Sequence, residues 1–169
     1  SSRIDKLLMT PPKRLGDIFL YTTAYEMAEV VPSTNIMIIG RPQGTYPLAA
    51  HLPDGVGTLI AGRTVSDVAS ITVWMLTEAT VMELSGLGEF EWPVTGLAAY
   101  LSCFTSTYES RLRSAIIADA VIPLGEQAVS YTDALAQQGQ DLSVVEFLIS
   151  TYGEEQVPRL LEAINELGD

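Results

Sequence analysis

The chain has 169 residues, of which 47% are hydrophobic and 18% are charged, so it can bury a core without disulfides or a metal. Its 21 Asp and Glu against nine Lys and Arg give a net charge of −12. This charge repels phosphate backbones and anionic lipid headgroups, and it argues against nucleic acid and membrane surfaces as partners. One histidine, His51, and one cysteine, Cys103, exclude a His-rich or Cys-rich zinc site.

No segment has the length and flanks of a transmembrane helix or a signal peptide. The longest apolar stretch, residues 68–82, is interrupted by Glu78. A lone cysteine is compatible with the reducing cytosol. We therefore expect a soluble, cytoplasmic protein; secretion of a longer precursor stays open because Ser1 and Ser2 can be a processed end.

The N-terminal part of the chain predicts a helix followed by short strands. Apolar side chains recur at helical spacing over residues 15–31, and Pro32 follows where a helix should have ended. Residues 35–40 and 57–61 are short runs of apolar and branched residues bounded by turn residues, which is typical of strands. Residues 46–50 favour a loop or an edge strand.

The remainder of the chain predicts helices. The first covers residues 64–84, begins with a capping box and ends at the glycines that follow. Trp92-Pro93 begins another, and further helices are expected over residues 109–120, 123–138, 143–152 and 154–167, with Gly153 as a break. We therefore predict a single domain over residues 1–169 with an α+β fold, in which a small N-terminal β-sheet packs with a mainly helical C-terminal half.

Four segments in this helical half, in order, suggest a family. They are "ITVWMLTEATVMEL", "WPVTGLAAYL", "AVSYTDAL" and "VVEFLISTYGEEQVPRLLEAINELG". Together they resemble the gluzincin-like metallopeptidase domains of the peptidase MA-like group. The resemblance covers residues 71–168, extends less specifically to residue 20, and implies a zincin-like fold.

In that family one helix carries His-Glu-x-x-His, and a later segment supplies a glutamate as the third zinc ligand. Thr77 and Val81 stand in the positions of the two histidines, and Thr95 stands in the position of the glutamate. Glu78 alone keeps its identity, and its counterpart in the family is the base for zinc-bound water. The later segment also matches at Trp92, Gly96, Ala98 and Tyr100.

The loss of the ligands has a direct chemical consequence. Positions 77 and 81 lie on one face of a helix, which is why imidazoles there converge on one ion. A threonine hydroxyl is a weak neutral donor to zinc, and valine offers no donor atom. We therefore expect a degenerate metallopeptidase-like domain with no metal and no cofactor, and no zinc-dependent proteolysis. Natural loss of the ligands and their deliberate removal would leave the same pattern.

The first functional hypothesis is a protein that binds a small, largely apolar molecule. The small replacements would leave a cavity lined by Thr77, Val81 and Thr95, with Glu78 at its edge. A partly desolvated carboxylate has a raised pKa and suits general acid or base catalysis, so the reaction would be an isomerisation, elimination (lyase) or cyclisation. Tyr100 and Trp92 would make further contacts with the substrate.

The alternative is a noncatalytic pseudopeptidase that acts as a protein-binding or regulatory module. In that case the three replaced positions are repacked core, and Glu78 is a surface glutamate. A closed apolar pocket that reaches Glu78 would favour the first hypothesis. A filled core with an exposed apolar patch elsewhere would favour the second. The sequence leaves the oligomeric state open.

Overall fold

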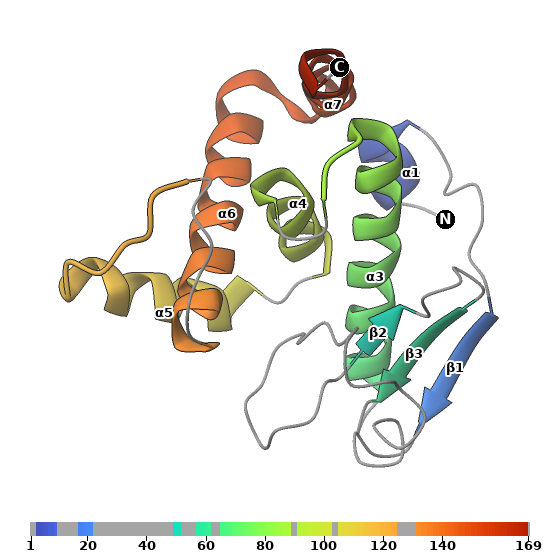
Figure 1. The fold of residues 1–169 in the computed structure, drawn as a ribbon, viewed down its shortest axis with the longest axis horizontal. Coiled ribbons are helices and arrows are strands. Elements are labelled where there is room, and N and C mark those ends of the chain that lie inside the picture. The colour runs from blue at the N-terminus through green and yellow to red at the C-terminus, as the bar shows by residue number, and fades with distance from the viewer. Residues whose placement is uncertain are drawn as a thin grey trace. The chain divides into compact units, whose positions relative to one another are not determined.

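A computed structural model describes residues 3–9, 17–21, 49–51, 57–61, 65–88, 91–102, 105–124 and 131–168 (Figure 1). The chain divides into two compact units. One contains residues 12–76, and the other contains residues 1–11 together with residues 77–169. Helix α3 (Val65–Ser85) contributes its first half to the former and its second half to the latter.

The unit of residues 12–76 contains a three-stranded sheet. Its strands are β1 (Asp17–Tyr21), β2 (Ala49–His51) and β3 (Gly57–Ala61), in the order β1-β3-β2. Strand β1 is parallel to β3, with Asp17 opposite Gly57, and β2 is antiparallel to β3, with His51 opposite Thr58. Ile71, Trp74 and Met75 of α3 are the buried apolar side chains described in this unit.

Strand β3 has the bounds expected from the sequence, and β2 overlaps the expected edge strand. The helix predicted over residues 15–31 is wrong at β1, whose residues pair with β3 instead. The segment "DIFLY" contains a branched and two aromatic residues, which favour a strand when a partner strand is present. The rest of that predicted helix, and the strand predicted over residues 35–40, lie outside the described residues.

The other unit is built from helices. Besides the second half of α3, it contains the elements α1 (Arg3–Leu8), α4 (Trp92–Ser102), α5 (Thr105–Ile117), α6 (Tyr131–Tyr152), the 3₁₀-helix η1 (Glu154–Gln156) and α7 (Val157–Gly168). The long α6 contacts both α4 and α5, and α1 contacts α7 (Figure 1). Burial concentrates on α4 and the middle of α6, where Val94, Leu97, Leu142 and Val145 are almost inaccessible to solvent.

The predicted fold class is wrong. The part of the chain whose side chains the structure places is 85% helical and contains no strand. An α+β fold with an N-terminal sheet packed with the helical half, of zincin-like type, is therefore not what the structure supports. Helices α4 and α5 both pack against α6, so these helices form a core among themselves.

In the C-terminal half, the sequence predicts two helices where the structure has one. Residues 123–138 and 143–152 were expected to form two helices separated near Gly139, but α6 is continuous from Tyr131, and residues 121–124 are not helical. Helix α5 begins four residues before the predicted start at Glu109. A Cβ on Gly139 would overlap the carbonyl oxygen of Tyr108, so this glycine allows close contact with α5 and does not break α6.

A second glycine sets the contact between α4 and α6. A Cβ on Gly96 would lie 2.5 Å from the carbonyl oxygen of Asp141 and 2.7 Å from Cγ2 of Val145. Contacts of that length are impossible without moving one helix. The absence of a side chain at position 96 therefore determines how closely α4 approaches α6.

Glycines also end two helices as predicted. Gly86 has a φ of 69° and donates its N–H to the carbonyl of Met82 at 3.0 Å, which ends α3. Gly153 has a φ of 92° and separates α6 from η1. Pro93 lies in the first turn of α4, where its missing N–H removes no helical hydrogen bond.

The Gly96→Ala variant tests the close contact of α4 with α6. We expect it to lower the free energy of unfolding in urea by about 1–3 kcal/mol, because the added methyl group meets backbone that cannot rotate away. Gly88→Ala is the matched control, since a Cβ there has its nearest neighbour 3.9 Å away. Equal stability of Gly96→Ala and the unmodified protein would contradict the proposed packing.

Candidate functional site

Three of the predicted site residues lie on one buried face of α3. Thr77, Glu78 and Val81 have no solvent-accessible area, and Ser85, one turn further on, donates its hydroxyl to the carbonyl of Val81 at 2.7 Å. A side chain that faced a cavity large enough for water would retain accessible area. The space around these three side chains is therefore filled in this structure, as the repacked-core interpretation requires.

The burial of Glu78 excludes its interpretation as a surface glutamate. A charged carboxylate in the interior must be compensated by hydrogen bonds or opposite charge. Burial of this kind is compatible with the predicted role as an acid or base. That role also needs contact with a substrate, so it stays a prediction.

The structure pairs Thr95 with an acid that the sequence analysis missed. Thr95 of α4 donates its hydroxyl to Oδ2 of Asp141 on α6, and the carbonyl of Glu91 lies 3.3 Å from the same hydroxyl as a second acceptor. Asp141 is only 2% exposed. It stands four residues before Val145 and seven before Leu148, so it interrupts one apolar stripe of α6; that position is the signal that could have identified it.

Asp141 is an unusual carboxyl group. Burial raises its pKa from 3.8 to about 7, although the hydrogen bond from Thr95 opposes this shift. Its Oδ1 has no hydrogen-bond partner among the described residues. With one oxygen unsatisfied and no compensating cation in this part of the structure, the charged form is disfavoured, and the carboxyl group keeps its proton up to a pH of about 7.

The remaining two predicted site residues lie toward the surface. The Tyr100 hydroxyl donates to Oε1 of Glu154 at 2.9 Å, and the guanidinium of Arg3 lies 4.8 Å from the centre of the Tyr100 ring. Tyr100 therefore connects α4 to η1 and α1. Burial, followed by the hydrogen bond to Glu154, raises its pKa. Trp92 is half-buried at the start of α4.

A groove lies at the end of α6, away from the residues that the sequence singled out. Its volume is about 530 Å³, and it is lined by side chains of α6, η1 and α7 together with Gly153: Leu148, Ile149, Tyr152, Gly153, Gln156, Val157, Arg159 and Leu160. Five of these eight residues are apolar or aromatic, so the walls are mainly hydrophobic. We refer to this site as the α6–α7 groove.

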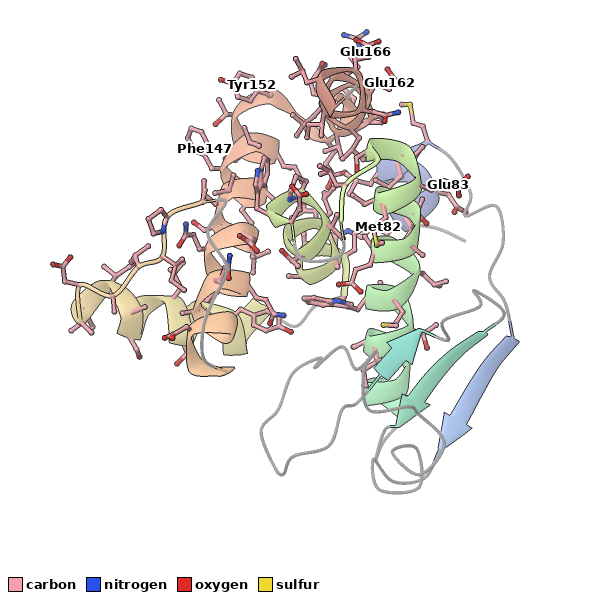
Figure 2. All side chains as sticks on the ribbon, in the orientation of Figure 1. Met82, Glu83, Phe147, Tyr152, Glu162 and Glu166 are labelled. Atoms are coloured by element: carbon pink, nitrogen blue, oxygen red, sulfur yellow. The ribbon has the colours of Figure 1, made fainter. Side chains whose placement is uncertain are left out.

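Two aromatic side chains near the end of α6 are exposed, and one of them, Tyr152, lines the α6–α7 groove. Phe147 is 62% exposed and Tyr152 is 60% exposed, and Figure 2 shows both projecting from the outer side of α6, away from α4. Glu162 and Glu166 occupy the solvent side of α7 in the same view. Residues 147–149 and 152 point in several directions around α6, so the core cannot cover all of them; this spacing of apolar residues is the sequence signal for an exposed apolar surface here.

Comparison of the chain with protein-family models, with curated proteins and with solved structures found no match. The resemblance to gluzincin-like metallopeptidases therefore stays a hypothesis. The described residues include no group of three His, Cys, Asp or Glu side chains placed to hold a metal ion. No helix in the described ranges is long and apolar enough to cross a lipid bilayer.

The raised pKa of Asp141 predicts a pH dependence. The folded state holds this proton more tightly than the unfolded chain, so the carboxyl group's contribution to stability is full below about pH 4, falls as the pH rises to about 7, and is constant above. The Asp141→Asn variant lacks this titration. As the pH rises between these limits, its free energy of unfolding should therefore gain on the order of 2–4 kcal/mol relative to that of the unmodified protein.

Urea unfolding measured across this pH range tests the prediction. The control is Glu166→Gln, which alters an exposed carboxylate of α7 and should leave the profile parallel to that of the unmodified protein. A profile of Asp141→Asn that is also parallel to the unmodified protein would show that Asp141 titrates normally.

Proposed function

We propose that the chain is a noncatalytic binding module, and that the α6–α7 groove holds apolar side chains of a segment of a partner protein. The observation that supports this most is the combination of a filled centre around Glu78 with an open apolar groove elsewhere. That combination is the one expected of a binding module rather than of a small-molecule enzyme.

The surroundings of the groove favour a protein segment as the occupant. A small ligand is usually enclosed, with most of its surface buried. Here the apolar lining is open to solvent, since Tyr152, which lines the groove, is 60% exposed. An amphipathic segment can fill a groove with one or two side chains and cover adjacent aromatic surface with its neighbours, and aromatic residues are typical anchors of such interfaces.

The catalytic hypothesis has one observation in its favour. Asp141 has a pKa of about 7 and contacts Thr95, so a carboxyl group suited to proton transfer at neutral pH lies beside one of the predicted site residues. A substrate would reach it only if α4 and α6 separated, because both side chains are buried. Acid or base catalysis by Glu78 or Asp141 is therefore the second candidate function. For either function, we propose the cytosol as the setting.

A selection of phage-displayed random peptides tests the binding proposal. The unmodified protein is the target, and Leu148→Glu, which places a charge in the groove wall, is used for counter-selection. We expect selected peptides to bind the unmodified protein saturably in fluorescence anisotropy, and to lose about tenfold or more in affinity with either Leu148→Glu or Tyr152→Ser.

Ile117→Ser provides the matched control, because Ile117 is an exposed apolar residue of α5 outside the groove. It should leave the affinity unchanged. A selection that yields no saturable binder, or peptides that bind the groove variants as well as the unmodified protein, would contradict the proposal.

A further inference from the structure

We infer that Arg159 recognises a carboxylate on the bound segment and so determines the register in which the segment binds; this inference rests on the proposed function. Arg159 is on α7 and lines the groove together with apolar residues of both helices. Its position gives a mainly apolar groove its one cationic lining residue.

The guanidinium of Arg159 is available for a ligand. Among the described residues it makes no ion pair, and its Nη1 donates only a long hydrogen bond of 3.5 Å to Oε1 of Gln156. Glu155 and Glu162 lie four residues before and three residues after it, a spacing compatible with ion pairs on a helix. The Glu155 carboxylate instead lies against Gly153, where a Cβ would be 2.5 Å from its Oε2.

The distribution of charge over residues 114–169 makes the position of Arg159 selective for a carboxylate. Over residues 114–169 Arg159 is the sole Lys or Arg, against ten Asp and Glu. A carboxylate on a partner is therefore attracted at Arg159 and repelled by the acids elsewhere in this region. Repulsion at the wrong positions contributes to specificity as much as attraction at the right one.

The chemistry of arginine suits this role. Its planar guanidinium can donate two parallel hydrogen bonds to one carboxylate, and its aliphatic stem can lie along apolar surface. The fitting partner is an amphipathic segment with apolar side chains facing the groove and one Asp or Glu at the position that meets Arg159. Its remaining positions are neutral or basic, because the chain carries a net charge of −12.

Helical peptides with a common Leu-rich face test the inference. Each peptide carries one Glu at a different position on an otherwise neutral background, and a Gln peptide serves as the reference. We expect one position at which Glu strengthens binding to the unmodified protein about tenfold over Gln. The gain should disappear with Arg159→Gln and persist with Arg113→Gln, an exposed arginine of α5. Arg159→Glu should instead prefer Lys at that position.

The outcomes separate the two proposals. If the peptides bind but Glu gives no advantage at any position, or the advantage survives Arg159→Gln, the role of Arg159 is overturned and the groove is retained. If no peptide binds, or binding is unaffected by Leu148→Glu, the proposed function fails. If decanoate binds more tightly than every peptide and depends on Arg159, the ligand is a free amphiphilic carboxylate and the inferred protein segment is wrong.

Discussion

The close packing of α4 and α5 on α6 is the constraint on which the rest of the structure depends. Gly96 lets α4 approach the backbone of α6 at Asp141, and Gly139 lets α5 approach α6 one half-turn earlier. Helices this close leave no room between them for water or for a ligand. The same packing takes the Asp141 carboxyl out of solvent, and its pKa rises as a result.

This packing also explains why the candidate binding site is at the end of α6. The middle of α6 packs against α4 at Asp141 and against α5 at Gly139, and its C-terminal end leads into η1 and α7. Helix α7 buries Val157 and Leu161 and leaves a groove beside α6 instead of covering it. The described helices therefore separate a buried centre that contains polar side chains from a mainly apolar groove at the end of α6.

The sequence was sufficient for features that depend on local chemistry. The C-terminal end of α3 and the start of α4 follow from Gly86 and Pro93, whose backbone preferences hold in any context. The common face of Thr77 and Val81 follows from helical geometry. The sequence was insufficient where tertiary contacts decide: Gly139 is a helix breaker by propensity but a contact residue in the packed structure, and Asp141 is unremarkable until α4 covers it. The fold class was wrong for the same reason. Local sequence patterns predict short strands, but they do not predict which helix packs against each helix face.

An NMR titration of the ¹⁵N-labelled protein with a selected peptide tests the central claim most directly, because it reports both regions in one experiment. The account predicts chemical-shift changes concentrated at residues 147–160, with the amides of residues 77–81 and of Thr95 unchanged. Shifts concentrated at residues 77–81 and Thr95, with none at residues 147–160, would contradict it and would place the binding site in the centre.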